Sequence, residues 1–446
     1  MVRDGISRRD PDDADPSPRF VAGAGAARAP GERLRDWLLP PGTRRWSAAR
    51  ATMRALRRRR PASRQELARV ERFITESPEA SESSEPGAAQ EARPSALLVR
   101  GCGGASGRYR VEAPALALER AGARVLVLDA LDPGLRRLAA SLGRALDLLI
   151  LQRVRLEPEI IALLEAAAAV GARRLFETDD LSVIPSAGAP LEAREISAQA
   201  ATLQRCDGVI VSTPALARAL EEVLPAGLER RVWPNWLTPA RVRVGDQRLA
   251  ARRRALAEAG ESGPAVIGYG SGTPSHDADL ELVAGALGVV LDERPELRLE
   301  LVGPVALPAA LRRHAGRITR CPLLTDDAWL ERLSSWSLNL APLVASPFAA
   351  AKSDVKWLEA ALVGVPTLAC PVGAYVRADD DARPGLMVAP AADWPARIGP
   401  ALDDLAALHE VGLRAAEFVR AERSIELGCG LSQGLLAEIR RGRAAG

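Results

Sequence analysis

The sequence predicts an α/β protein with two doubly wound, Rossmann-like domains that follow one another along the chain. Short apolar runs alternate with helical patterns, glycine and proline bound these segments, and the alternation restarts once near the middle of the chain. Such alternation is typical of a parallel sheet covered by helices on both faces. Because ligands bind these sheets at the carboxyl ends of the strands, we expect ligand space there in each domain.

Length and composition agree with this prediction. A chain of 446 residues is long enough for two domains and an extension, and 47% hydrophobic residues supply sizeable cores. The net charge of +3 and the low aromatic content of 4% do not suggest a nucleic-acid partner.

Cysteine and histidine usage bounds the compartment and the chemistry. The five Cys are scattered and contain no CxxC pair, which fits a reducing cytoplasm, and the three His are too far apart in sequence to form a metal cluster. The N-terminus has no apolar run typical of a signal peptide, and no run approaches the ~20 residues that span a bilayer. We therefore expect a cytoplasmic protein, bound at most to a membrane surface.

The first 94 residues differ from the rest of the chain. Runs rich in Pro, Ser and charge are predicted not to fold. Between them, residues 44–60 carry apolar residues at 3-4-3 spacing opposite an Arg-rich face, which predicts an amphipathic helix. This helix could lie on an anionic membrane, or it could be solvated or docked on the body of the protein. Residues 65–75 predict a second short helix.

The first predicted domain is 95–240. Its strands are expected at 96–100, 124–129, 146–152, 173–177 and 208–212, and its helices at 112–122, 158–170, 196–204 and 214–224, with a glycine loop at 101–107. Thr213 is a predicted N-cap.

The second predicted domain is 241–425, and it opens with a charged helical stretch. Its strands are expected at 265–270, 298–303, 337–342, 366–370 and 386–388, and its helices at 277–292, 326–334 and from 394 onward. We expect the last segment, 426–446, to be a helix that packs back on the first domain.

Two lysines stand out in an Arg-rich chain. Of 60 basic residues only Lys352 and Lys356 are Lys. A compact ammonium suits a phosphate, whereas chance within an Arg-biased composition is the alternative. If a helix begins near Ser353, Lys356 opposes the helix dipole in the first turn, which is tolerable if an anion lies in front of it. Glu359 lies on the same side and could accept from ribose or sugar hydroxyls, or pair with Lys356.

A glycine-rich loop lies between a strand and a helix in the same domain. Gly270, Gly272 and Thr273 belong to this loop, where glycine lets the backbone approach a ligand and the helix N-terminus attracts anions. The loop is not GxGxxG, so the dinucleotide fingerprint is not met, and a tight connection is the alternative. With Lys352, Ser353 and Lys356, the loop predicts a diphosphate site.

The second half resembles the donor domain of the bacterial group 1 (family-4-type) glycosyltransferases with the GT-B fold, and the first half is similar to their acceptor domain. The resemblance covers about residues 95–426. The motifs that carry it are 268–273, 299–304, 339–343 and 352–367 in the second half, and 107–111, 151–154, 177–181 and 211–214 in the first.

The resemblance implies a cytoplasmic hexosyltransferase that uses neither metal nor cofactor. A nucleotide diphosphate sugar would bind in a cleft between the domains and give its sugar to a glycan, a lipid-linked acceptor or a small molecule, as in the synthesis of cell-envelope polysaccharide. The chain departs from the family at Ala351, where many members carry the earlier of two Glu. Contacts with the donor sugar, and the retaining stereochemistry usual in the family, are therefore open.

Other polar residues are candidates for the acceptor side. Asp179 and Asp180 follow a strand and could contact the acceptor or act as a general base, or else serve as an N-cap and a solvated carboxylate. Arg108 and Arg110 could hold phosphate or acceptor, with solvent exposure as the alternative. The acidic run 379–381 is interpreted as a loop, and no metal site is expected.

Two other functions stay open. One is a non-catalytic nucleotide-sugar-binding or scaffolding protein of the same fold. The other is a nucleotide-sugar epimerase, which usually needs His in the cleft, whereas the first domain contains none.

Overall fold

The computed structural model describes residues 64–75, 93–142, 146–185, 193–221, 224–225, 227–259, 265–273, 276–376 and 383–445. The chain divides into two compact units, 1–52 and 53–446, and all described residues belong to the second. The predicted membrane-surface helix at 44–60 and the acidic run at 379–381 lie outside the described residues.

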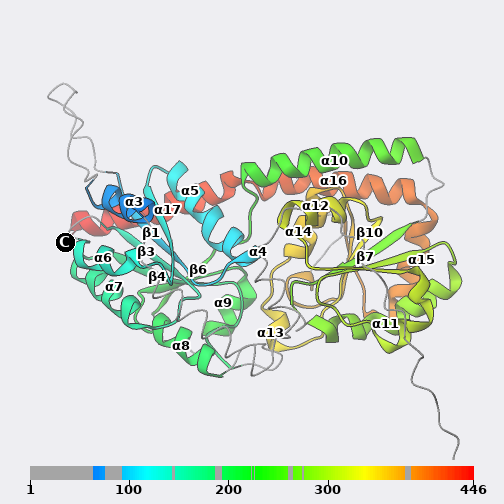
Figure 1. Ribbon diagram of the computed structural model, residues 1–446, viewed down its shortest axis with the longest axis horizontal. Helices are drawn as coiled ribbons and strands as arrows, with labels where there is room; N and C mark the ends of the chain where they lie inside the picture. Colours follow the sequence, from blue (N-terminus) through cyan, green and yellow to red (C-terminus); the bar gives the residue numbers. More distant parts are fainter. Residues whose placement is uncertain are drawn as a thin grey trace, which may run out of the picture. The chain divides into compact units, whose positions relative to one another are not determined.

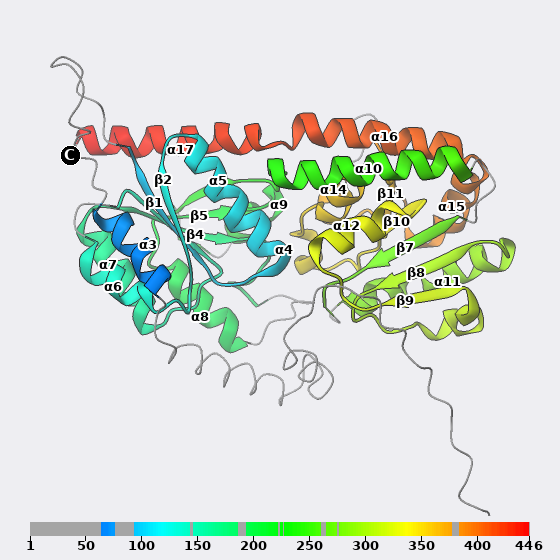
Figure 2. The same ribbon diagram turned by 45° about the horizontal axis from the view of Figure 1, so that its top comes forward.

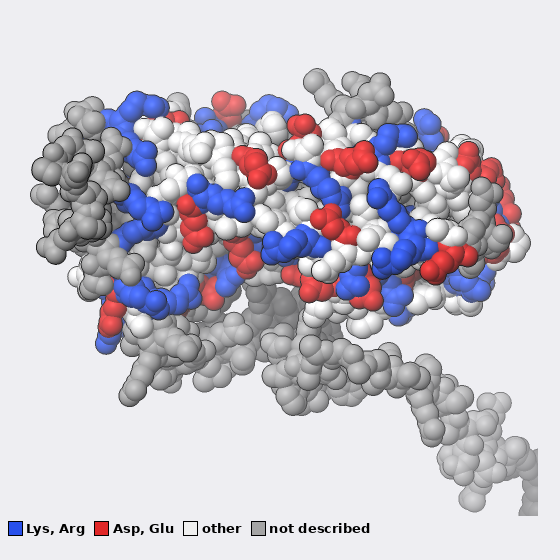
Figure 3. Space-filling model, turned by 90° about the horizontal axis from the view of Figure 1, so that it is seen from above, with Lys and Arg blue, Asp and Glu red and all other residues white. Residues whose placement is uncertain are grey.

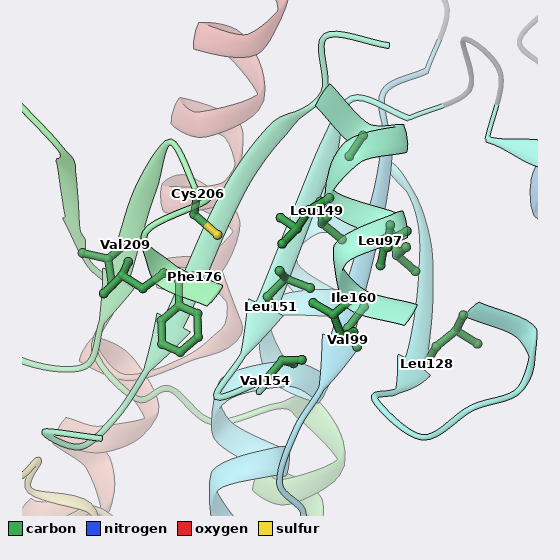
Figure 4. Close-up of a cluster of buried hydrophobic side chains, with 14 of the residues drawn as sticks. Leu97, Val99, Leu128, Leu149, Leu151, Val154, Ile160, Phe176, Cys206 and Val209 are labelled. Atoms are coloured by element: carbon green, nitrogen blue, oxygen red, sulfur yellow. The ribbon is translucent and has the colours of Figure 1, made fainter. Parts of the chain in front are cut away.

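The first sheet has six strands, all parallel, in the order β2-β1-β3-β4-β5-β6. They are β1 (Ser95–Arg100), β2 (Arg124–Asp129), β3 (Leu148–Gln152), β4 (Arg173–Thr178), β5 (Gly208–Val211) and β6 (Glu229–Val232). Figure 1 labels the strands β1, β3, β4 and β6 of this sheet. The central strand β3 is buried at all five positions, as expected for a strand with helices on both faces. Figure 4 shows part of this core, in which Leu97, Leu149 and Leu151 pack beside Ile160.

Helices surround this sheet. They are α3 (Arg64–Thr75), α4 (Gly104–Gly107), the π-helical turn η1 (Arg108–Glu112), α5 (Ala113–Arg120), α6 (Gly134–Ser141), α7 (Pro158–Ala169), α8 (Ala193–Leu203) and α9 (Pro214–Glu221). The N-cap prediction for Thr213 is confirmed, because its Oγ1 accepts the Leu216 N–H at 3.0 Å. The expected helix start at 112 is wrong: the helical turns begin at Gly104. Pro114 lacks an N–H and would break a regular helix, and the π-helical turn directly before it accommodates this defect.

The second sheet is also parallel and six-stranded, in the order β12-β11-β10-β7-β8-β9. Its strands are β7 (Val266–Gly270), β8 (Arg298–Val302), β9 (Ile318–Cys321), β10 (Leu338–Ala341), β11 (Thr367–Ala369) and β12 (Leu386–Val388). Its helices are α10 (Pro239–Ala259), α11 (Asp277–Glu293), α12 (Asp326–Ser334), α13 (Pro347–Ala350), α14 (Val355–Leu362), α15 (Trp394–Asp403) and α16 (Leu405–Glu422), with short 3-10 turns at Ala309–Arg317, Gly373–Tyr375 and Ala391–Asp393.

The last helix, α17 (Ile425–Ala445), packs on α5 of the first sheet (Figure 2). Leu435 and Leu436 are buried there with Trp236. Basic and acidic side chains are interspersed over the face shown in Figure 3, and ion pairs such as Arg420 with Asp246 join neighbouring helices. Within the described ranges, no helix is both long enough and apolar enough to cross a bilayer.

Candidate functional site

Lys356 lies at the carboxyl end of β7. It occupies the first turn of α14, and its Nζ donates to the carbonyl of Gly270, the last residue of that strand. The same ammonium lies 4.8 Å from the centre of the Tyr269 ring, which is fully buried. Burial lowers the pKa of Lys356 to about 8; Lys352 adds to this shift, and Asp279 and Glu359 oppose it. The side chain thus stays mostly charged at neutral pH and holds a cation against the Gly270 backbone.

Lys352 approaches the first sheet. Its Nζ lies 3.4 Å from Asp180 Oδ1 and 4.6 Å from the centre of the Phe348 ring. The preceding residue, Ala351, is buried, and its carbonyl accepts the Thr213 hydroxyl at 2.9 Å. These contacts bring residues that follow α13 beside residues that follow β4 and β5.

Ser353 also bonds across to the first sheet. Its Oγ accepts from Asn235 Nδ2 at 3.0 Å. The helix begins two residues later than expected, at Val355, with Asp354 at the N-cap position. Asp354 is buried and accepts from Arg423 at 2.5 Å, so its charge is neutralised within the protein.

The surroundings of Gly270, the last residue of β7, differ from those of Gly272, in the loop after it. A Cβ at Gly270 would overlap the Trp329 ring, so packing requires glycine there. A Cβ at Gly272 would meet no atom within 4 Å, so packing within the protein does not explain that glycine. Thr273 contributes its carbonyl, which accepts the Ser271 hydroxyl at 2.8 Å.

Glu359 is buried and held by four hydrogen-bond donors. Its Oε1 accepts from Arg241 at 2.7 Å, Tyr109 at 3.1 Å and Arg108 at 3.4 Å, and its Oε2 accepts from Trp329 at 2.9 Å. Arginines, and not Lys356, are therefore its ionic partners among the described residues. Each carboxylate oxygen has about two acceptor positions. Oε1 already receives three donors and Oε2 receives one, so only Oε2 keeps room for another donor.

Asp179 and Asp180 share one cation. Arg153 Nη1 lies 3.2 Å from Asp179 Oδ1 and 3.3 Å from Asp180 Oδ2. Burial would raise the pKa of Asp179, but Arg153 and Arg110 outweigh it, so the pKa of Asp179 lies below its ordinary value. Asp179 is therefore ionised at neutral pH. It can accept hydrogen bonds and pair with a cation, and it is a weaker base than an ordinary aspartate.

The two arginines after the first glycine loop have different surroundings. Arg108 pairs with Asp326 as well as Glu359. Arg110 is 1% exposed, and it donates to Glu177 at 2.5 Å, to the Trp233 carbonyl at 2.6 Å and to Asn235 at 3.1 Å. The expected alternative of solvent exposure is therefore wrong for Arg110, because this ion pair and its hydrogen bonds compensate the burial of its charge.

Sequence reasoning missed several residues around these candidates. Arg153 adopts a left-handed backbone with φ of 48°, which no sequence pattern indicated. Arg241 and Trp329 reach Glu359 from α10 and α12, over long sequence separations. His276, at the N-cap position of α11, bonds to Asp279 Oδ2 at 2.7 Å. In the described part of the chain, no three His, Cys, Asp or Glu side chains gather as a metal ion would require.

Two parallel, doubly wound sheets, with hydrogen bonds between residues that follow their strands, define the GT-B fold. Anabaena HepE in complex with UDP and glucose is similar in structure, with a TM-score of 0.56 and 13% identity over 77% of this chain and 100% of that one. A glycosyltransferase from Rickettsia africae ESF-5 has a TM-score of 0.51 and 14% identity over 78% of this chain and 98% of its own.

At the sequence level, no family model matches the chain. A curated relative, D-inositol 3-phosphate glycosyltransferase of Streptomyces scabiei (strain 87.22), is 30% identical over 187 residues. That match covers 36% of this chain and 41% of the relative, so the chain spans about two fifths of the relative's length.

Proposed function

We propose that this chain is a metal-independent glycosyltransferase of the group 1 (family-4-type) class. It moves a hexose from a nucleotide diphosphate donor to a glycan, lipid-linked or small-molecule acceptor, as in the synthesis of cell-envelope polysaccharide. The observation that carries the proposal is the pair of lysines, with Lys356 against Gly270 and Lys352 after α13. The name of the Streptomyces relative and the UDP-glucose complex of HepE support it.

In the proposed reaction, the two lysines stabilise the leaving group. In the transfer, the bond from the anomeric carbon to the β-phosphate oxygen breaks, and its electron pair stays on the phosphate. The hydroxyl oxygen of the acceptor molecule forms the new bond to the anomeric carbon and loses its proton. Asp179 and Asp180 are the candidate bases that take up this proton. The ammoniums of Lys352 and Lys356 and the N-terminus of α14 stabilise the charge on the departing diphosphate.

A nucleotide screen tests the donor. We expect UDP, GDP or dTDP, or their hexose conjugates, to raise the melting temperature, because a ligand that binds only the folded state stabilises it in proportion to RT ln(1 + [L]/Kd). Mass spectrometry then detects the transferred hexose on candidate acceptors. If none of these nucleotides shifts the melting temperature at millimolar concentration, the proposal fails.

A non-catalytic nucleotide-sugar-binding protein is the second candidate, and two observations favour it. Ala351 is buried where many family members carry Glu, and Glu359 is already held by two arginines. Calorimetric donor binding with neither hydrolysis nor transfer, across glycan, lipid-linked and small-molecule acceptors, would support this candidate over an enzyme.

For the N-terminal extension, residues 1–94, we propose contact with an anionic membrane through the Arg-rich segment 44–60. Vesicles that contain anionic lipid should then sediment the full chain, and deletion of residues 1–93 should abolish this. Equal sedimentation of the full chain and the deletion variant rules out the N-terminal extension as the membrane anchor.

A further inference from the structure

His276 stands at the start of α11 in a fixed orientation. Its Nδ1 lies 2.7 Å from Asp279 Oδ2, and the other oxygen of this buried carboxylate accepts the Val344 N–H at 2.8 Å. Because an ionised carboxylate can only accept, Nδ1 carries the hydrogen. Nε2 then faces away from this bond as the nitrogen that can accept a second proton, and no described residue hydrogen-bonds to it.

His276 is connected to the lysine site through Tyr269. The Tyr269 hydroxyl donates to the His276 carbonyl at 3.2 Å, and the same ring carries the Lys356 ammonium at 4.8 Å. The His276 backbone, the phenol and the ammonium thus meet around the carboxyl end of β7, and the charges of both lysines act on the imidazole. The charged or titratable groups that act on the imidazole or lie beside it are Asp277, Asp279, Tyr269, Lys352 and Lys356.

These surroundings keep the ligand-free imidazole neutral. Burial lowers the pKa of His276 below its ordinary value, and the charges of Lys356 and Lys352 lower it further, against the hydrogen bond to Asp279. The diphosphate of a nucleotide sugar carries two negative charges, so between the lysines it cancels their two positive charges and removes their lowering of the His276 pKa. A group that is neutral beside two ammoniums would then become cationic beside the anion.

We propose that His276, held by Asp279, is the third cationic group of the diphosphate site and takes up one proton from solvent when a nucleotide diphosphate sugar binds. Nε2 accepts this proton, and the resulting N–H donates to a phosphate oxygen. The inference rests on the proposed function, since it needs a diphosphate at Lys352 and Lys356.

Calorimetry measures the proton directly. UDP-glucose, GDP-mannose and dTDP-glucose are titrated at pH 7 in two buffers of different ionisation enthalpy. The phosphates of these donors carry no proton at neutral pH, so any uptake belongs to the protein. We expect close to one proton for the donor that binds. Lys356, with a pKa of about 8, is mostly protonated already at pH 7 and contributes little there, but it contributes more at pH 8.5.

Two variants assign the proton to a residue. His276→Asn keeps an N–H near the Nδ1 position for Asp279 and places nothing at Nε2. We expect it to lose the uptake at pH 7, keep the uptake at pH 8.5 and bind the donor about tenfold more weakly, which is about 1.4 kcal/mol. His409→Asn, on α16, is the matched control and should keep the wild-type uptake.

A wild-type measurement keeps the inference testable if His276→Asn does not fold. The chain has only three His, so their ring protons can be followed by NMR against pH. We expect donor binding to raise the pKa of one imidazole well above 7, because uptake of close to one proton at pH 7 requires this. Donor binding without proton uptake at pH 7, or uptake that persists in His276→Asn, overturns the inference but leaves the proposed function standing. Failure of all three donors to bind overturns both.

Discussion

Each of the two lysines contacts an aromatic ring and an oxygen atom. Lys352 lies over Phe348 and near Asp180, and Lys356 lies over Tyr269 and bonds to the Gly270 carbonyl. A small ammonium on a flexible stem fits between a ring and an oxygen atom, whereas the wider, planar guanidinium requires a different geometry. The contacts give a physical reason why an Arg-rich chain has Lys at these two positions.

The pKa of Lys356 predicts how donor affinity depends on pH. The free side chain loses its proton as pH rises through about 8, and a bound diphosphate raises this pKa. The contribution of Lys356 to affinity should therefore be nearly constant around pH 7, weaken as pH rises through 8, and fall by up to tenfold per pH unit above that, in addition to any fall that proton uptake by His276 causes. Calorimetric titration of the donor from pH 7 to 9.5 checks this, and Lys356→Met should flatten the curve above pH 8. A wild-type affinity that is constant to pH 9.5 contradicts the assignment.

The buried ion pair of Arg110 and Glu177 is expected to stabilise the folded protein. Both side chains are almost fully buried. Replacing one partner leaves a buried charge uncompensated, so Arg110→Met should lower the free energy of unfolding by about 3–5 kcal/mol. The double variant Arg110→Met, Glu177→Leu should recover most of this loss in urea denaturation. A single variant within about 0.5 kcal/mol of wild type would show that the pair is not as buried as described.

At the scale of elements, glycines in α17 differ in their surroundings. A Cβ at Gly428 would overlap the Trp236 ring, whereas a Cβ at Gly434 would meet nothing within 4 Å. Gly428→Ala should therefore destabilise the protein by about 1–3 kcal/mol through overpacking. Gly434→Ala should stabilise it by about 0.5–1 kcal/mol, because Ala favours the helix. Thermal denaturation of both variants tests the packing of α17, and equal shifts would contradict it.

The sequence predicted elements best where a strand is apolar and a helix has clear ends. Residues 124–129 match β2, and Gly364, with φ of 74°, ends α14 before Pro366. The strands β6 and β9 were missed because they are edge strands: Glu229–Val232 and Ile318–Cys321 contain Arg and no apolar run. Short edge strands with polar residues look like loops, since burial gives them little pattern.

The candidate site was predictable only in part, for a similar reason. Lys352 and Lys356 were apparent from composition, and the loop after β7 from its glycines. The four donors that hold Glu359 come from elements far away in sequence, and one sequence contains no signal for such pairings. Sequence spacing suggested Lys356 as the ionic partner of Glu359, but the fold brings Arg241 and Arg108 instead.

At the scale of the whole molecule, hydrogen bonds join residues that follow the strands of both sheets. Thr213 donates to the Ala351 carbonyl, and Asn235 donates to Ser353. Residues 351–356, which include both lysines, belong to the second sheet's domain and are hydrogen-bonded to residues that follow strands of the first sheet. This arrangement supports the proposal that a donor held by the second sheet meets an acceptor held by the first.

The most direct test of this account is the calorimetric Kd of the donor that the nucleotide screen selects, measured for Lys356→Met at pH 7. Met keeps the length of the side chain and removes its charge, and Arg254→Met, an exposed position on α10, is the control. Charge-assisted hydrogen bonds contribute about 1.5–3 kcal/mol, so the Kd should rise by about 10- to 100-fold for Lys356→Met and stay unchanged for the control. A wild-type Kd in Lys356→Met would contradict the placement of the diphosphate at this lysine.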